Sequence, residues 1–456
     1  MLNKPSPQQT ALEMVSLDGL VPKDHLLRKI DAAIDFSFIH DRVAGLYCPD
    51  NGRPPLDPTL MFKALFIGYL FGVRSERQLV REIEVNVAYR WFLGLKLLDP
   101  VFDASTLSQN RRRRYNDTMV AQDIFDAIVE QAIRHGLVDG TVLYTDSTHL
   151  KANANKNRYD TAVVAKSRAD YWDALDVAIG EDRAAHGKKP LKDNPRAPAE
   201  KETKVSRTDP DSGYMVRDGK PKGFFYLDHR TVDGRHAIIT DTHATPANVH
   251  DSIVYLGRLD RQRERFGFNV GAVGLDAGYA TSGIAKGLEQ RGVLGVTGYR
   301  RPTPPRPGMM ASKQFQYEAE ADGYRCPQGQ LLVYATTDRT GYRHYKSDPA
   351  VCRTCPLLAS CTSSRNAIRL IVRHVWADAR ERTDAHRLTP WGKRIYKRRK
   401  ETVERSFADA KQLHGHRYAR FRGLLAVACQ CLLAAAAQNI KKIALALALP
   451  PTHAPA

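Results

Sequence analysis

The first part of the chain has a helical pattern of apolar positions up to about Gly140. Its most apolar run, 59–71, follows a passage rich in turn residues, 52–58. Asp57 is expected to cap this helix with Pro58 in its first position, because a carboxylate there accepts free amides and proline has none to satisfy. The pattern predicts an all-α domain over residues 1–138.

Two further helices are predicted after this run. Ser75, with Gln78 three residues later, is typical of a capping pair, and Asp103 or Ser105 opens the next helix. Helix, short turn, helix and then a basic helix is the order of a helix-turn-helix DNA reader, although plain three-helix bundles share it. A block of like charges favours DNA because it needs an anionic partner. This block consists of Arg111, Arg112, Arg113 and Arg114.

Strand-like runs begin near residue 141. The run 141–148 has the composition and apolar start of a central strand. Asp146, expected at the end of this strand, is either a turn former or a catalytic ligand. Two more runs, 223–232 and 236–242, flank Asp233-Gly234, a hairpin turn signal. The three runs predict an antiparallel unit.

The residues between these strands are different in character. Residues 155–222 are charged and poor in large apolar side chains, which is typical of an insertion or flexible connection, with a helix expected at 162–185. Before it, Lys151 continues the first strand and is placed to contact a phosphate. After the hairpin, His250 and Asp251 are interpreted as a helix cap and a pair at the rim of a site.

A second acid ends a buried strand predicted at 269–276. This acid is Asp276, and a glycine turn follows it. A helix capped by Thr281 or Ser282 and a strand at 293–297 complete a β-α-β crossover. In open α/β sheets the ligand crevice lies outside the carboxyl ends of the parallel strands, and Asp276 stands at such an end.

A third acid lies in the segment 397–411, which has no Gly or Pro and a helical spacing of apolar residues. Glu404 and Lys411 are two turns apart, so both project from one flank of the predicted helix. A carboxylate there, among basic side chains, can hold a hard cation close to a phosphate backbone; a solvated helix with internal ion pairs is the alternative. The basic residues are Lys397, Lys400, Arg405 and Lys411.

The net charge of the chain indicates which kind of partner it binds. The chain has 456 residues and a net charge of +19, which predicts a polyanionic partner, either nucleic acid or an anionic membrane. Residues 1–20 lack the apolar core of an export signal, so a cytoplasmic location is expected. The apolar stretch 423–449 is interrupted by polar residues, so we expect a packing helix rather than a membrane span.

Short alternating runs between 301 and 375 predict a small β-rich insertion that contains four of the seven cysteines. The pair Cys352-x2-Cys355 has the spacing of a metal knuckle. The sequence therefore predicts a structural zinc site, with reduced thiols and disulfides as alternatives. Its ligands would be Cys326, Cys352, Cys355 and Cys361, while Cys48, Cys429 and Cys431 are expected to be ordinary buried residues.

An acid on the first strand, a second on the fourth and a third on a late helix is the layout of the RNase H-like nucleases. With Asp-Ala-Gly-Tyr at 276–279 and Glu-x6-Lys at 404–411, the chain resembles the DDE transposases of bacterial insertion sequences, in the superfamily numbered four and five. The passages 52–58, 72–75 and 103–108 are similar to the amino-terminal domain of these enzymes, so the resemblance covers nearly the whole chain.

The chain departs from this family at one motif. The usual Tyr-x2-Arg-x3-Glu prefix would place tyrosine at position 397 and arginine at position 400, where the chain has Lys397 and Lys400. Tyr396 comes one place early, so its role does not carry over directly.

The resemblance implies an RNase H-like mixed sheet with flanking helices, preceded by a helix-turn-helix-like domain. It implies that Asp146, Asp276 and Glu404 are the catalytic residues and hold two divalent cations, Mg²⁺ or Mn²⁺. Lys411 would contact a phosphate near the cleavage point. The expected activity is cleavage at terminal inverted repeats and strand transfer into target DNA, by a homodimer on double-stranded DNA in the bacterial nucleoid, without a membrane partner.

Two alternatives to a transposase share parts of this pattern. A structure-selective RNase H-fold nuclease has the same acids, and a non-catalytic DNA-binding protein derived from a transposase keeps the basic helices. The expected organisation is a helical DNA-binding domain (1–138), the first part of the catalytic core (139–300, with the 155–222 insertion), the cysteine-containing insertion (301–375), the helical completion of the core (376–449) and a tail (450–456).

Overall fold

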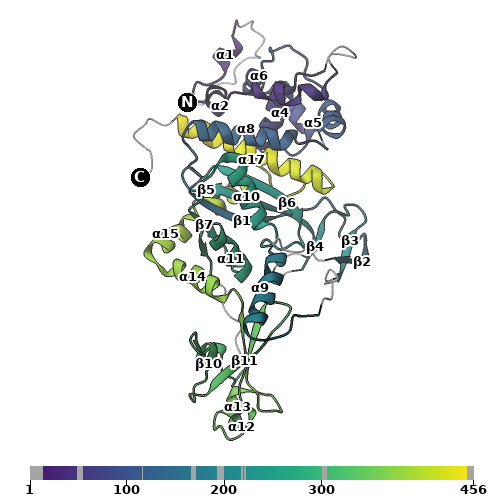
Figure 1. Cartoon of the computed structure of the whole chain (residues 1–456). Coiled ribbons are helices and arrows are strands. Elements are labelled where there is room, and N and C mark those ends of the chain that lie inside the picture. Colours follow the sequence, from purple (N-terminus) through teal and green to yellow (C-terminus); the bar gives the residue numbers. More distant parts are fainter. Residues whose placement is uncertain are drawn as a thin grey trace, which may run out of the picture.

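The computed structural model describes residues 14–48, 55–115, 117–165, 171–192, 200–216, 219, 222–299 and 306–448. Figure 1 shows three regions along its length: a layer of amino-terminal helices, a mixed sheet with helices around it, and a small β-rich region at the opposite end. The chain is thus a mixed α/β protein. The expected tail at 450–456 and residues 52–54 of the turn-rich passage lie outside the described residues.

Three helices of the amino-terminal layer begin at the predicted capping residues. The carboxylate of Asp57 accepts a hydrogen bond from the Thr59 amide at 2.9 Å, and Pro58 occupies the first helical position. Ser75 and Asp103 cap the next two predicted helices. The elements are α1 (Leu17–Leu20), α2 (Leu26–Ala33), α3 (Phe38–Val43), η1 (Ala44–Leu46), α4 (Pro58–Leu70), α5 (Glu76–Val85), α6 (Val87–Leu93), α7 (Ala104–Asn110), the π-helical turn η2 (Arg111–Tyr115) and α8 (Val120–Arg134).

A long carboxy-terminal helix, α17 (Leu424–Leu447), joins the helical layer to the large sheet (Figure 1). It contacts α2, α4 and α8 as well as β6. Its polar residues are satisfied inside the protein, as when the Asn439 amide exchanges two hydrogen bonds with the Ile239 backbone. By length and composition alone it could cross a membrane, but 72% of its most apolar window is buried. The predicted packing helix is confirmed.

The large sheet has the strand order β4-β5-β1-β7-β8, with β6 beside β5. The strand β1 is antiparallel to β5 and parallel to β7, and β7 is parallel to β8. The predicted antiparallel unit and β-α-β crossover are therefore confirmed. The strands are β1 (Val142–Lys151), β4 (Gly213–Met215), β5 (Gly223–Asp233), β6 (Ile239–Pro246), β7 (Ala272–Leu275) and β8 (Leu294–Thr297), with α10 (Tyr255–Phe266), η3 (Ala277–Tyr279) and α11 (Ser282–Gln290) between them.

Two predictions in this region are wrong in their boundaries. The second hairpin strand begins at Ile239 rather than at residue 236, because the Asp233 amide donates to the Ile238 carbonyl across a longer turn in which Ala237 has a positive φ of 56°. The helix expected at 162–185 begins only at Trp172, as α9 (Trp172–Ala185). The residues before it form β2 (Tyr159–Ala165), which pairs with β3 (Glu200–Ser206) within the stretch expected to be flexible.

The β-rich region contains the predicted insertion strands. Its sheet has the order β13-β12-β11-β10-β9 and an apolar core that includes Phe315 and Tyr345. We call residues 306–376 the cysteine module. Its elements are η4 (Ser312–Gln314), β9 (Gln316–Glu318), β10 (Gly323–Arg325), β11 (Leu331–Thr337), β12 (Tyr342–Lys346), α12 (Pro349–Cys352), α13 (Leu358–Cys361) and β13 (Leu370–His374). Of the other cysteines, Cys431 is buried as expected, whereas Cys429 is only half-buried and Cys48 is exposed, because it follows η1, a turn without buried residues.

The helix α9 fastens the cysteine module to the rest of the chain. Asp182, with a side chain that is 5% exposed, pairs with the Arg343 guanidinium at 2.5 Å and accepts a hydrogen bond from Thr337 at 2.5 Å. One turn on, His186 contacts Asp322 at 2.6 Å and stacks on the Tyr334 ring. The helix α9 of the predicted charged insertion thus packs against the cysteine-containing insertion, although the two were predicted separately.

Candidate active site

Two of the three predicted acids lie on neighbouring strands. The prediction that Asp146 ends its strand is wrong, because β1 continues to Lys151 through its antiparallel pairing with β5. Asp146 lies in β1, and Asp276 directly follows β7. Thr145 and Leu275 are paired across these parallel strands, so the two acids occupy the next register position together. Adjacent strands are about 4.8 Å apart, which brings the two carboxylates to one edge of the β1–β7 pair. The Asp276 carboxylate is held by the Gly278 amide at 2.7 Å.

The charge on Asp146 is unfavourable in its surroundings. Its side chain is 20% exposed, and burial raises its pKa to about 6 against the lowering effect of Arg399. The carboxylates of Asp276 and Asp251 raise this pKa further. A carboxylate that is poorly hydrated and surrounded by like charges binds cations well, because a cation relieves both penalties.

The third predicted acid, Glu404, lies just after a break in its helix. Residues 397–411 were expected to form one helix, but α15 (Pro390–Arg398) ends before α16 (Val403–Gln412) begins, so this prediction is wrong. The Thr402 hydroxyl donates back to the Arg398 carbonyl at 2.8 Å, and the Glu404 amide donates to the Arg399 carbonyl at 3.1 Å. The break places Glu404 in the first turn of α16, with a side chain that is 46% exposed.

Arg399 connects the acids across this break. Its guanidinium lies 2.7 Å from the Asp146 carboxylate and 3.7 Å from that of Glu404, and its side chain is only 4% exposed. Sequence reasoning missed this residue, which is one of four consecutive basic residues and carries no signal of its own. A buried positive charge therefore lies between two of the three predicted acids.

A fourth carboxylate, Asp251, belongs to the same site. It accepts a hydrogen bond from the Ser147 hydroxyl at 2.8 Å and lies 3.5 Å from the ring of His229. Burial holds the pKa of His229 well below its usual range, so this histidine is neutral. From the sequence, His250 and Asp251 are expected to form a helix cap and a rim pair. The cap is wrong, because the next helix, α10, begins only at Tyr255 and the His250 ring contacts the Ser252 hydroxyl at 2.8 Å.

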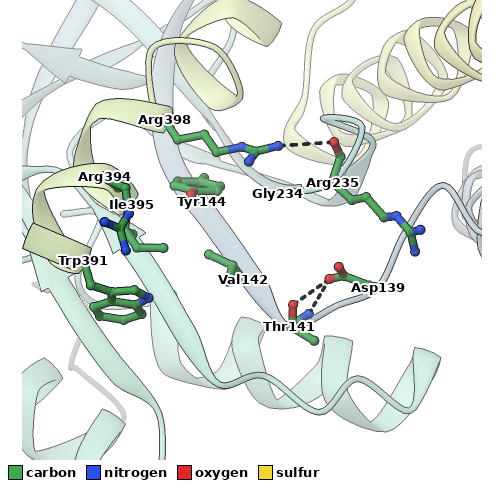
Figure 2. A pocket seen from close by; sticks show the side chains of 10 residues that line it. All are labelled: Asp139, Thr141, Val142, Tyr144, Gly234, Arg235, Trp391, Arg394, Ile395 and Arg398. Carbon is green, nitrogen blue, oxygen red and sulfur yellow. Dashed lines mark hydrogen bonds between the residues drawn. The ribbon is translucent and has the colours of Figure 1, made fainter. Parts of the chain in front are cut away.

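A cavity of about 370 Å³ lies beside the amino-terminal part of β1 (Figure 2). Val142, Tyr144 and Asp146 are alternate residues of β1, so the cavity and the acid share one face of the strand. Figure 2 shows basic side chains from α15 and from the β5–β6 turn around it, and the Arg398 guanidinium donates to the Arg235 carbonyl at 3.4 Å. The lining residues are Asp139, Thr141, Val142, Tyr144, Gly234, Arg235, Trp391, Arg394, Ile395 and Arg398.

The predicted DNA-binding residues fall into two groups. Arg111 pairs with Glu76 at 3.1 Å and lies over the Phe421 ring, and Arg114 lies over the Tyr47 ring, so both pack against other protein groups. Lys411 is half-buried. The exposed members are Arg112, Arg113, Lys151, Lys397, Lys400 and Arg405, of which Arg405 pairs with Asp409 at 2.9 Å.

A separate group of metal-ligating residue types lies in the core. The ligand atoms of Asp228, His416 and Cys431 are within 4.8 Å of one another, and all three side chains are buried. The Asp228 carboxylate already accepts from Arg230 at 2.9 Å, from Thr242 at 2.6 Å and from His416 at 2.9 Å. Because the Arg230 guanidinium already balances the negative charge of Asp228, the group forms a polar network that needs no metal ion. We call it the closed network.

Two family models match the chain. One, described as a transposase domain (DUF772), matches residues 15–113, and the other, described as a transposase DDE domain, matches residues 325–444. Both descriptions place the chain among the transposases. The second description is of a DDE transposase domain. The matched ranges include Glu404, whereas Asp146 and Asp276 lie between them.

Other comparisons add little to this identification. The solved piggyBac transposase synaptic complex with hairpin DNA is similar over 93% of this chain and 77% of that chain, with 10% identity and a TM-score of 0.31. No curated protein matches the chain.

Proposed function

We propose that this transposase cleaves DNA at the ends of its element and joins them to target DNA, with Asp146, Asp276 and Glu404 as the catalytic carboxylates. The observation that carries the proposal is the link among the three acids. Asp146 and Asp276 both follow the last paired position of the parallel strands β1 and β7, and Arg399 bridges Asp146 to Glu404. Segments more than 100 residues apart in the chain thus supply one acidic site.

The strand order supports an RNase H-like core. An antiparallel trio, β1, β5 and β6, is followed by the parallel strands β7 and β8, with acids on the first and fourth strands of this series. The helical region at 1–138 is proposed as the DNA-binding domain, with Arg112 and Arg113 exposed. The residue ranges expected for the other domains are kept as part of this proposal.

The donor atoms fit hard divalent cations. The predicted ligands are all carboxylate oxygens, which suit Mg²⁺ or Mn²⁺. Two such cations would activate the attacking hydroxyl and stabilise the leaving oxygen of a phosphodiester displacement. Asp146, Asp276 and Glu404 would hold them, while Arg399 keeps Asp146 oriented and balances its charge. A homodimer acting on paired DNA ends in the nucleoid completes the proposal.

In this proposal the bound DNA extends from the catalytic carboxylates across the cavity of Figure 2. Arg235, Arg394 and Arg398 surround it, and none of the three forms an ion pair with a carboxylate of the described residues. Free guanidiniums on the face that carries Asp146 are suited to the phosphates on either side of the cleavage point. Trp391 adds an aromatic surface beside them.

Replacing Arg394 and Arg398 together by alanine should weaken binding to element-end DNA by at least tenfold. The reason is that each arginine neutralises about one phosphate, so the salt dependence of binding should also become shallower by about 2 units of slope. Gel-shift titrations at several salt concentrations measure both quantities. The matched control removes the same charge from Lys188 and Lys189, which are exposed after α9. Equal losses in the two variants would reject the cavity as a specific DNA contact.

Replacing Asp251 by asparagine should raise the Mg²⁺ concentration needed for half-maximal cleavage by about tenfold, as is typical for residues that support metal ligands. The change keeps the side-chain shape while removing the negative charge beside Ser147 and Asp146. Mg²⁺ titrations of cleavage show this shift, and DNA binding without metal should not change. The control is Glu264 to glutamine, an exposed acid on α10. An unchanged Mg²⁺ requirement in Asp251→Asn would mean that this carboxylate does not support the site.

The decisive test of the proposed function uses DNA that flanks the coding region. Fragments carrying the native terminal repeats should be cut at the repeat ends with Mg²⁺, and scrambled repeats should not. Cleavage of both fragments alike would instead indicate a structure-selective nuclease. Binding without cleavage under any divalent metal would indicate a DNA-binding protein.

A further inference from the structure

The tip of the cysteine module has no buried side chains. Residues 348–366 include α12 and α13, two helices of four residues each, and none of these residues is buried. Helices this short are not stable alone, and a segment without buried side chains gains little from the hydrophobic effect. Hydrogen bonds such as that from the Met310 amide to the Ser360 carbonyl at 2.7 Å hold the tip to the module, and a further cross-link would stabilise it.

Four thiols gather at this tip from two separate places in the chain. Cys352 ends α12, Cys355 follows it in a turn closed by a 3.1 Å backbone hydrogen bond, and Cys361 ends α13. Cys326 lies in the β10–β11 turn, where the Gly329 amide donates to its carbonyl at 2.8 Å and Gly329 has a positive φ of 76°. All four are half-buried and free of disulfides.

The β10–β11 turn and the end of α13 meet at the base of the tip. Cys326 and Cys361 pack against the same apolar core of the module. The only group of metal-ligating atoms within 4.8 Å of one another among the described side chains lies elsewhere, so binding would have to draw the four sulfurs together.

Arg369 connects the tip to the base of the module. Its guanidinium donates to the Cys361 carbonyl at 2.6 Å and to the Met310 carbonyl at 3.1 Å. It also lies over the Phe315 ring, which fixes it at the base of the tip. The end of α13, and with it Cys361, is therefore held beside the β-rich core.

We propose that Cys326, Cys352, Cys355 and Cys361 bind one zinc ion, which orders residues 348–366 and holds them to the β10–β11 turn. Four thiolates are the ligand set of a closed structural zinc site, and such sites fold small segments that have no sufficient core. The site is distinct from the carboxylates, because the cysteine module lies at the end of the molecule away from the helical layer while β1 and β7 lie in the large sheet (Figure 1). Its role is structural and does not depend on the proposed DNA chemistry.

Metal analysis of the whole protein tests the ligand set. Purified protein should contain about one equivalent of zinc per chain, and cobalt exchanged into it should give the intense sulfur-to-cobalt absorption of a four-thiolate site. The double variant Cys352→Ser and Cys355→Ser should lose both, whereas Cys48→Ser, at an exposed cysteine outside the module, should keep both. Zinc-free protein from zinc-supplied cells, or cobalt bound without this absorption, would overturn the proposal.

Limited proteolysis tests the structural role separately from any activity. Trypsin can cut at Arg353 and Arg365, which are both exposed in the tip. We expect a zinc chelator, or the double cysteine variant, to increase cleavage at these two sites at least tenfold, and added zinc to reverse the chelator effect. Cleavage that is equally fast with and without zinc would show that the metal does not order this segment. Disulfides in place of zinc would appear as thiols that react only after reduction.

Discussion

Replacing Glu404 by alanine should abolish Mg²⁺-dependent cleavage of element-end DNA, with a loss of about 10³-fold or more. The carboxylate lies in the first turn of α16, next to the buried Arg399 that contacts Asp146, and its side chain is half-exposed toward the solvent where DNA must bind. Losing one of three carboxylate ligands removes several kcal/mol of transition-state stabilisation, and each 1.36 kcal/mol is about tenfold in rate.

The control for this experiment is another glutamate in the same break. Glu401 is exposed in the turn between α15 and α16, three residues before Glu404. Glu401→Ala should cleave at nearly the wild-type rate, and both variants should bind element ends without divalent metal as the wild type does. Cleavage retained by Glu404→Ala, or an equal loss in Glu401→Ala, would reject the assignment of Glu404. Tyr396 lies one position earlier than the family motif would place it, so the comparison also decides whether Glu401 or Glu404 is the catalytic glutamate of that motif.

Local sequence signals predicted the elements that carry two of the acids. The β-rich run around Asp146 marks a strand and the glycine turn after Asp276 marks a strand end, because both depend on short-range preferences. The crossover from β7 to β8 also followed, because a β-α-β unit has few alternatives. The position of Asp146 beside Asp276 was implied only by the resemblance to the RNase H-like nucleases.

The break before Glu404 could not be predicted in this way. Residues 397–411 contain neither glycine nor proline, and their apolar spacing fits one continuous helix. The helix instead stops where Arg399 turns inward to Asp146, a partner 253 residues away in the chain. A long-range ion pair thus overrides local helix propensity, and such a contact leaves no mark in the local pattern. The cavity of Figure 2 could not be predicted either, because its lining residues come from β1, the β5–β6 turn and α15, which are far apart in the sequence.

The prediction that residues 155–222 form a flexible connection was wrong for a similar reason. The stretch 155–222 has few large apolar residues, which is typical of flexible chain. Two segments from it, β2 and β3, nevertheless pair over seven residues each, because backbone hydrogen bonds across a ribbon do not require apolar side chains. The helix α9 in the same stretch finds its partners, Arg343 and Thr337, in the distant cysteine module.

Replacing Asp228 by alanine should lower the free energy of unfolding by about 3–5 kcal/mol, because it leaves a buried arginine without its counter-charge. The Asp228 and Arg230 side chains are both 0% exposed and lie 2.9 Å apart. Arg230 keeps a hydrogen bond to Gln438 at 2.9 Å, which cannot replace a carboxylate. Chemical denaturation measures the loss, and Asp24→Ala, at an exposed site before α2, should change stability by less than about 0.5 kcal/mol.

The Cys431 side chain separates this explanation from a metal site in the same network. If Arg230 is the cation that closes the network, Cys431 acts as a small apolar group, and Cys431→Ala should cost only about 1 kcal/mol. If the Asp228, His416 and Cys431 side chains instead held a metal ion, Cys431→Ala should destabilise the core about as much as Asp228→Ala does. Comparable losses in the two variants would therefore contradict the closed network. A small loss in Cys431→Ala beside a large one in Asp228→Ala would support it, because only the carboxylate balances the buried guanidinium.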